Sequence, residues 1–376
     1  MKIRAAVLLE PLADRTAAAG GPFRVETLDL EEARVGEVLI RIHAVGVCHS
    51  DWHLATGATK HPMPVVPGHE GAGVVEAVGP GVDDLKPGDA VVLNWAPSCG
   101  SCFYCLRGRS NLCETYTAPI WAGTLLDGTT RLSWKGKPVY SYCGLAAFAE
   151  KTVVPRQSVV PIPADTPMDV AALVGCAVAT GVGAAMYTAN VRPGESVVVL
   201  GCGGVGLSCI QGAAVCGAAP IIAVDTQWPK IWVAKHFGAQ TALATADFAE
   251  MDAVVRRLTA GRGADHVFEA VGLPALQEKA LSLVRPGGTL TLAGLSPMGS
   301  VTHFPSALLT RQEKTIKGSY YGTVHAPRDF PMLLDLYMSG KLKLDELISR
   351  RYSLEQIDEA FRDMLDGGLA RGVIVF

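Results

Sequence analysis

The stretch ESVVVLGCGGVGLSCIQGAAVCGAAPIIAVD, residues 195–225, decides the fold. It opens with a β-branched run at 197–200, which is typical of a buried strand, and continues into an apolar segment with helical character that reaches about Val215. A second run of the same kind at 221–224 ends in Asp225. A strand, a glycine-rich turn, a helix and a second strand, in this order, predict one βαβ unit of a parallel sheet.

The glycines of this turn indicate a ligand. They follow the spacing G-x-G-x-x-G at Gly201, Gly203 and Gly206, and Asp225 lies 19 residues after the last of them. Glycine lets the backbone approach a pyrophosphate, which then faces the N-terminus of the helix. Asp225 can accept hydrogen bonds from ribose hydroxyls, and its charge would repel a 2′-phosphate. The stretch therefore predicts binding of NAD rather than NADP.

The sequence on either side of this unit predicts two domains. Downstream, a helical segment around 229–237 and β-rich segments at 264–272 and 283–294 continue the alternation of a doubly wound, mostly parallel sheet. Upstream of residue 170, short β-rich runs are split by glycine and proline, and no regular helix is expected between them. The prediction is an α/β chain with a compact β-rich domain and a Rossmann domain.

The length and composition of the chain are consistent with two domains and a large hydrophobic core. The chain has 376 residues, of which 49% are hydrophobic and 18% charged, so a large core is expected. A net charge of −3 provides no basic footprint for nucleic acid. The apolar start ends at Glu10 and Pro11, too early for a secretory signal. The uncharged stretch 170–191 could span a membrane, but its Ala, Gly and Thr content favours a buried turn-and-helix segment.

Four of the ten cysteines form a closed metal-binding pattern. The segment CGSCFYCLRGRSNLC has the spacing C-x2-C-x2-C-x7-C, at Cys99, Cys102, Cys105 and Cys113. Four thiolates at this spacing can surround one tetrahedral Zn²⁺ and leave no open position, so this metal would be structural. The alternatives are four unrelated thiols or an iron–sulfur cluster, although the x7 gap and the lack of a following proline fit the cluster patterns poorly.

A second set of ligands is scattered along the chain. VCHSDWHLATG (47–57), VVPGHEGAGVV (65–75) and LVGCAVATG (173–181) contribute Cys48, His69 and Cys176. Taken alone, Cys176 is more often a small buried hydrophobe than a ligand. Together, two cysteines and one histidine form a three-ligand set that leaves one tetrahedral position open, as in catalytic zinc sites. Asp51 and Glu70 could orient a histidine ligand from behind.

The chain resembles the zinc-dependent medium-chain alcohol dehydrogenases over nearly its whole length, most closely the liver-type, NAD-dependent branch. The resemblance rests on GVCHSD, PGHEGAGVVEAVG, the four-cysteine lobe, GTLLDGTTRLSWKGKP (123–138), LVGCAVATG, GCGGVGLS and RGVIVF. It implies a GroES-like catalytic domain at 1–177, completed by 320–376, with a structural zinc lobe at about 95–115. It also implies a dinucleotide-binding Rossmann domain at 178–319.

The resemblance also implies roles for single residues. The catalytic zinc ligands would be Cys48, His69 and Cys176, with Glu70 behind the metal and Asp51 orienting the histidine. Ser50 would receive the substrate proton and His53 would pass it to solvent. Cofactor contacts would come from His49, Thr180, Gly201, Gly203, Gly204, Val205, Gly206, Asp225, Lys230 and Arg371.

The resulting expectation is reversible hydride transfer between a primary or secondary, apolar or aromatic alcohol and NAD. The enzyme would carry two Zn²⁺ per chain and act as a cytoplasmic homodimer without nucleic-acid or membrane partners. Three alternatives remain open: a polyol or threonine dehydrogenase, a glutathione-dependent formaldehyde dehydrogenase, and a non-catalytic redox sensor that binds NAD and zinc. The first two belong to the same superfamily, and assays with alcohols, polyols and glutathione would separate them.

Overall fold

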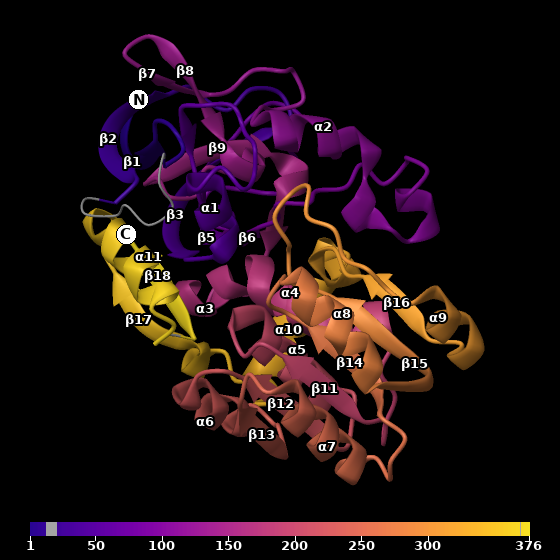
Figure 1. Cartoon of the computed structure of the whole chain (residues 1–376). Coiled ribbons are helices and arrows are strands. Elements are labelled where there is room, and N and C mark those ends of the chain that lie inside the picture. The colour runs from indigo at the N-terminus through magenta and orange to yellow at the C-terminus, as the bar shows by residue number, and fades with distance from the viewer. Residues whose placement is uncertain (13–20, 369) are drawn as a thin grey trace. The chain divides into compact units, whose positions relative to one another are not determined.

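The computed structural model describes residues 1–12, 21–368 and 370–376 (Figure 1). The chain forms two compact units. Unit 1 contains Met1–Cys176, His325–Met338 and Leu344–Phe376, and unit 2 contains Ala177–Val324 and Ser339–Lys343. The sequence predicts boundaries at 177/178 and 319/320, and it assigns the short segment Ser339–Lys343 to the catalytic domain, whereas in the structure this segment belongs to unit 2.

Unit 1 is built on two groups of strands. A closed barrel has the strand order β1 (Lys2–Leu8), β2 (Phe23–Leu30), β7 (Leu132–Trp134), β8 (Lys137–Ser141) and β4 (Val65–Val66). A seven-stranded sheet has the order β10 (Val159–Pro161), β6 (Ala90–Leu93), β5 (Gly71–Val78), β3 (Glu37–Gly46), β18 (Arg371–Val375) and β17 (Ile348–Tyr352), and β9 (Lys151–Pro155) also pairs with β3. The C-terminal strand β18 is antiparallel to β3, so the end of the chain completes this unit (Figure 1).

Unit 1 also contains helices, of which the sequence analysis expected only the one that begins near residue 170. They are α1 (His49–Ala55), α2 (Glu114–Ala122), α3 (Met168–Leu173), α10 (Ala326–Met338) and α11 (Ile357–Leu365). The expectation of no regular helix among the β-rich runs before residue 170 is therefore wrong at α1 and α2. Both are short, with seven and nine residues, and α2 contains Pro119, so neither presents a long helical repeat in the sequence.

Unit 2 is a parallel, doubly wound sheet. Its strand order is β13 (Thr241–Ala244), β12 (Ile221–Asp225), β11 (Val197–Leu200), β14 (Ala264–Glu269), β15 (Val284–Leu292) and β16 (Thr315–Gly318). Its helices are α4 (Ala179–Gly183), α5 (Gly204–Val215), α6 (Trp228–His236), α7 (Phe248–Leu258), α8 (Pro274–Leu283) and α9 (Ser306–Gln312). All five strand pairs are parallel, which confirms the predicted Rossmann architecture.

The uncharged stretch near residue 170 is helical throughout. Met168–Ala189 forms one helical run that includes α3, α4 and two π-helical segments, and it ends at Asn190, whose φ is +59°. Among the described residues, it is the one helix long and apolar enough to cross a membrane, and 89% of its most apolar window is buried inside the protein. Such burial is typical of a core helix, although the expected turn is absent from this described run.

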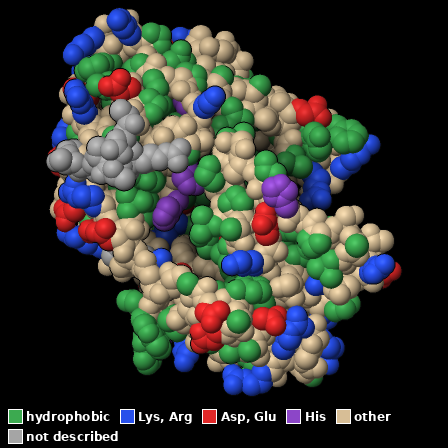
Figure 2. Space-filling view, viewed as in Figure 1, with side chains coloured by type: hydrophobic (Ala, Val, Ile, Leu, Met, Phe, Trp, Pro, Cys, Tyr) green, Lys and Arg blue, Asp and Glu red, His purple; other side chains and the backbone are tan. Residues whose placement is uncertain are grey.

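Charged side chains of both signs are interspersed on the displayed face of the molecule. In Figure 2, both basic and acidic groups occur across this face. Apolar side chains also project over α6, where Trp228 and Trp232 are 66% and 72% exposed.

Candidate active site

The open metal-ligand set comes together in unit 1. Cys48 directly precedes α1, His69 and Glu70 directly precede β5, and Cys176 lies in the π-helical segment after α3. One ligand atom from each of these four residues lies within 4.8 Å of the other three. The chain thus brings together side chains separated by up to 128 residues in the sequence. His69 and Glu70 are 2% and 0% exposed, whereas Cys48 is half-buried, so the cluster is reached from the side of Cys48.

Asp51 lies beside the histidine of this cluster. It lies in the first turn of α1 with no exposed surface, and its Oδ1 accepts a hydrogen bond from the Gly68 amide at 2.8 Å. Its Oδ2 lies 3.1 Å from His69 Nδ1. A carboxylate at Nδ1 favours the tautomer that leaves Nε2 available to a metal. Gly68 adopts φ +92°, and a Cβ there would lie 2.4 Å from the Phe148 amide nitrogen, so the turn requires glycine.

The donor atoms of this cluster fit a zinc ion. Although both atoms are buried, His69 Nε2 and Glu70 Oε1 have no hydrogen-bond partner among the described residues. A hydrogen bond with Cys176 lowers the pKa of the Cys48 thiol well below its usual value, and the positive charge of His69 and Arg371 adds to this shift against the effect of burial. Two sulfurs and one imidazole nitrogen are the donors that an open zinc site uses, and thiolate is the form of cysteine that binds the metal.

Burial and charge oppose each other at His69. Burial works to lower the pKa of this imidazole, but the negative charges of Asp51, Cys176 and Cys48 outweigh it and raise the pKa well above its ordinary value. A histidine surrounded by anionic groups marks a place where a cation is favourable, because a metal ion replaces the proton in the same electrostatic environment.

Arg371 lies against the metal cluster, a contact that sequence reasoning missed. One of its terminal nitrogens, Nη2, pairs with Glu70 Oε2 and also donates to the Val47 carbonyl at 3.0 Å. The two charged side chains are 5% and 0% exposed. Burial raises the pKa of Glu70 to about 7, although Arg371 opposes the shift. The expected pyrophosphate contact of Arg371 stays a prediction. The pairing joins residues 301 positions apart, which no local pattern indicates.

The predicted proton relay lies on α1. Ser50 Oγ is 3.8 Å from Cys48 Sγ, which places the hydroxyl beside the open ligand set. His53 lies in the last turn of α1 and is half-buried, whereas His49 at the start of the helix is exposed. Residues three positions apart lie on neighbouring parts of a helix surface, so Ser50 and His53 can serve one path.

Tyr142 contacts both the backbone of Ser50 and the ring of His69. Its hydroxyl donates a hydrogen bond to the Ser50 carbonyl at 3.3 Å, and its ring meets the His69 ring edge-on, with centroids 5.7 Å apart. Burial raises the pKa of the Tyr142 hydroxyl well above its ordinary value, so this group stays a neutral donor. The aromatic ring therefore forms part of the wall beside the predicted ligands.

The four cysteines of the lobe form the second cluster. The sulfurs of Cys99, Cys102, Cys105 and Cys113 all lie within 4.8 Å of one another. The distance between Cys102 Sγ and Cys113 Sγ is 3.9 Å, close to the separation of about 3.8 Å expected for thiolates around a tetrahedral zinc.

Backbone N–H groups also point at these sulfurs. The Cys102 amide donates to Cys99 Sγ at 3.3 Å, and the Cys99 amide donates to Cys113 Sγ at 3.3 Å. Hydrogen bonds from Thr115 and Ser101 lower the pKa of Cys99 to about 5. Burial raises the pKa of Cys105 to about 12, so the thiolate character is strongest at Cys99, and the four sulfurs together fit a closed metal site.

Unit 2 holds the glycine-rich turn in the geometry that a dinucleotide requires. Gly201 adopts φ +93°, and a Cβ on Gly206 would lie 1.8 Å from the Gly201 carbonyl oxygen. A Cβ on Gly203 would meet no atom within 4 Å, so space is open where a pyrophosphate would approach. Gly204 is the first residue of α5, whose N-terminal amides face this space.

The other predicted cofactor residues of unit 2 surround this turn. Asp225 ends β12, and its Oδ2 accepts a hydrogen bond from the Cys202 amide at 2.8 Å. Thr180 in α4 is 8% exposed, and a Cβ on its neighbour Gly181 would lie 2.4 Å from the Val205 carbonyl, so α4 and α5 pack closely here. Lys230 is half-buried in α6.

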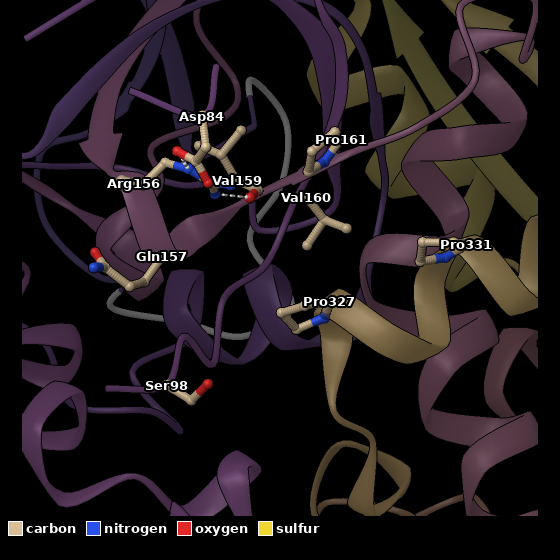
Figure 3. Close-up of a pocket in the computed structure, with 9 residues that line it drawn as sticks. All are labelled: Asp84, Ser98, Arg156, Gln157, Val159, Val160, Pro161, Pro327 and Pro331. Atoms are coloured by element: carbon tan, nitrogen blue, oxygen red, sulfur yellow. Dashed lines mark hydrogen bonds and ion pairs between the residues drawn. The ribbon is translucent and has the colours of Figure 1, made fainter. Parts of the chain in front are cut away.

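Unit 1 contains a separate hollow of about 480 Å³, drawn in Figure 3. Its lining residues are Asp84, Ser98, Arg156, Gln157, Val159, Val160, Pro161, Pro327 and Pro331. The Arg156 guanidinium is already bound to the Asp84 carboxylate and to the Val159 carbonyl, as the dashed lines show. None of the predicted metal, proton-relay or cofactor residues lines this hollow, so it lies apart from the chemistry.

The chain combines a β-rich unit, which has one open and one closed zinc-type ligand set, with a dinucleotide-binding Rossmann unit. This combination is typical of metal-dependent dehydrogenases. Residues 34–164 match the alcohol dehydrogenase GroES-like domain, and residues 204–339 match the zinc-binding dehydrogenase domain. The chain belongs to the zinc-dependent medium-chain alcohol dehydrogenase family.

Relatives match the chain from end to end. It is 43% identical to an NDMA-dependent alcohol dehydrogenase of Amycolatopsis methanolica, with 100% of this chain and 99% of the relative covered. It is 41% identical to alcohol dehydrogenase B of Mycobacterium tuberculosis, with 94% and 95% covered. Among solved structures, benzyl alcohol dehydrogenase from Acinetobacter calcoaceticus has a TM-score of 0.92 at 29% identity, with 100% of this chain and 99% of the other covered.

Proposed function

We propose that this alcohol dehydrogenase uses NAD and two zinc ions to interconvert primary or secondary alcohols with aldehydes or ketones. The observation that carries the proposal is the three-ligand set of Cys48, His69 and Cys176 beside the Ser50 hydroxyl. A bound zinc supplies a Lewis acid that makes a substrate hydroxyl more acidic. The closed lobe of four cysteines supports a second zinc with a structural role.

The residues of α1 handle the proton in this proposal. Ser50 Oγ accepts the proton of the substrate hydroxyl as it gives up its own, and His53 takes up the released proton and passes it to water. Histidine suits this task because its ring exchanges protons with water near neutral pH. Asp51 and Tyr142 hold the surrounding groups in place, the first through His69 and Gly68 and the second through the Ser50 carbonyl.

NAD is the proposed cofactor because Asp225 ends the strand after the glycine-rich turn. A ribose hydroxyl can donate to this carboxylate, whereas the 2′-phosphate of NADP would meet a like charge.

A second candidate concerns the electron acceptor. A relative at 43% identity is described as NDMA-dependent, which supports oxidation of alcohol with NDMA in place of free NAD.

We propose an apolar or aromatic alcohol as substrate, because the wall beside His69 is the Tyr142 ring and one structural relative is a benzyl alcohol dehydrogenase.

The test is a kinetic panel with benzyl alcohol, ethanol, 2-propanol, sorbitol, threonine and formaldehyde with glutathione. Each substrate is offered with NAD⁺, NADP⁺ or NDMA. The proposal expects the highest kcat/KM for benzyl alcohol with NAD⁺. Turnover only with NDMA would support the second candidate, and turnover with the polyol, threonine or the glutathione adduct alone would contradict the proposed substrate class.

We also propose that the enzyme is a homodimer. Among the described residues, the two edge strands of the six-stranded sheet, β13 and β16, each pair with one neighbour only. Such an edge is suited to pairing with a second copy. Light scattering on the purified chain checks this, and a monomer at assay concentration would contradict it. The predicted cytoplasmic location stays a prediction.

A further inference from the structure

Unit 2 contains a buried carboxylate that neither the predicted mechanism nor the fingerprint uses. Glu269 ends β14 and is 0% exposed. It takes part in no ion pair among the described residues, so its partners are uncharged N–H groups. A charged side chain is seldom buried without a cationic partner, because desolvation is costly unless hydrogen bonds replace the lost water. The position of Glu269 therefore calls for an explanation.

Glu269 holds the loops that follow two neighbouring strands. Its Oε1 accepts hydrogen bonds from the amides of Val271 and Gly272 at 2.9 and 2.8 Å. Its main-chain carbonyl accepts from the amides of Ala293 and Gly294, at 2.9 and 2.8 Å, in the segment after β15. One residue thus fixes the course of the backbone beyond both β14 and β15.

A glutamine extends this network into the longer of the two loops. The Gln277 side-chain amide in α8 donates to Glu269 Oε2 and to Ser296 Oγ, both at 3.1 Å. Its carbonyl oxygen accepts from the Thr302 hydroxyl at 2.8 Å. Gln277 is 4% exposed, so each of its bonds is shielded from water.

The loops held in this way pack against each other and against the glycine-rich turn. A Cβ on Gly272 would lie 2.4 Å from the Leu295 carbonyl oxygen, and a Cβ on Gly201 would lie 2.5 Å from a methyl group of Val271. Val271 and Leu295 are nevertheless 46% and 55% exposed, so they present apolar surface at this edge of the sheet. A shift of the loop after β14 would move that surface.

The strand order indicates which half of a dinucleotide meets this surface. Asp225 ends β12 on one side of β11, and Glu269 ends β14 on the other. A dinucleotide lies across the carboxyl ends of the strands, with one half on each side of this central strand. Because Asp225 is placed for the adenosine ribose, the loops after β14 and β15 face the nicotinamide half.

We infer that Glu269 is a positioning residue for the nicotinamide half of the cofactor. This inference rests on the proposed use of a nicotinamide dinucleotide. Glu269 acts through the loops that it holds, which set the apolar surface of Val271 and Leu295. The glycine-rich turn has its own support, because the Cys202 amide donates to Asp225 and the Gly201 amide donates to the Val224 carbonyl. Binding of the adenosine diphosphate half should therefore depend on Glu269 much less than binding of the nicotinamide half does.

The test compares two ligands that differ only by the nicotinamide ring. Calorimetry on the full chain measures the Kd of NADH and of ADP-ribose for wild type, Glu269→Gln and the control Glu278→Gln. Glu278 lies in α8 beside the network and accepts the His303 amide at 2.8 Å, but its side chain is 36% exposed. In Glu269→Gln, one N–H group must lose its acceptor, so we expect NADH affinity to fall about tenfold. ADP-ribose affinity should change less than twofold, and the control should match wild type.

A second variant keeps the test decisive if Glu269→Gln fails to fold. Gln277→Met removes the donor to Glu269 and should produce the same selective loss, at about threefold. Equal losses for NADH and ADP-ribose, or no loss for either, would overturn the inference. Wild-type protein that binds neither ligand would overturn the proposed cofactor and this inference with it.

Discussion

In the proposed proton relay on α1, Ser50 and His53 have different tasks, so their substitutions should have different effects. His53→Gln should lower alcohol oxidation by about tenfold at pH 6–7, because it removes the group that passes the proton to water. High pH or added imidazole should restore much of the rate. Ser50→Ala should be more severe at every pH, because it removes the hydroxyl beside Cys48.

The measurement is the pH–rate profile of each variant with and without imidazole. His303→Gln is the matched control, since this histidine lies in unit 2 with a side chain 84% exposed. A His53→Gln profile identical to that of wild type would remove His53 from the relay and leave Ser50 to pass its proton by another route.

Asp225 should decide the choice between the two nicotinamide dinucleotides. Asp225→Gly removes the ribose acceptor and the charge that opposes a 2′-phosphate, so the preference for NAD⁺ should narrow by about tenfold or more. The ratio of kcat/KM for the two cofactors measures this. Wild-type protein that uses NADP⁺ as efficiently as NAD⁺ would contradict the role given to Asp225.

At the residue scale, the sequence predicted the candidate site residues that lie in short motifs. It did not predict those that depend on long-range contacts. Cys48, His69 and the lobe cysteines are recognisable because their spacing is local or resembles a family. Neither the pairing of Glu70 with Arg371 nor the burial of Glu269 could be predicted from the sequence, because each depends on how strands distant in the sequence pack together. Only a contact map could have found them.

The close packing of α4 against α5 requires glycine at position 181, and this requirement can be tested. A Cβ on Gly181 would lie 2.4 Å from both the Ser208 Cβ and the Val205 carbonyl oxygen. Gly181→Ala should destabilise the protein by about 1–3 kcal/mol, the usual cost of overpacking. Because Thr180 and Val205 flank the crossing, cofactor affinity should fall as well.

The matched control is Gly368→Ala, outside the helices and strands, where a Cβ would meet no atom within 4 Å. Urea unfolding of both variants gives the comparison. If the two variants unfold at the same urea concentration as wild type, the packing argument for α4 and α5 fails.

The elements of unit 2 around the glycine-rich turn were predictable because their sequence is regular, whereas β13, α7, α8, α9 and β16 were not predicted. The strand predicted at 197–200 is β11, and the helix predicted to reach about Val215 ends there as α5. In unit 1 the same reasoning failed for α1 and α2, which are too short to show a helical repeat. The barrel strands of unit 1 pair across long separations, so their order could not be deduced from local patterns.

At the scale of the whole molecule, the two ligand clusters should have separable effects. Cys102→Ser breaks the closed lobe, and structural zinc contributes directly to the free energy of folding. The variant should therefore unfold at lower temperature or fail to assemble. Cys176→Ser leaves the four-cysteine lobe intact. It should therefore keep the thermal midpoint close to that of wild type while abolishing alcohol oxidation. Calorimetric melting of the two variants separates these outcomes, and similar melting of both would contradict the division of roles.

Metal analysis of active protein tests the central claim most directly, that one chain combines a structural zinc with a catalytic one. We expect two zinc ions per chain in wild type, and one zinc ion per chain in a folded but inactive Cys176→Ser variant. A fully active wild-type chain with a single zinc ion would contradict it.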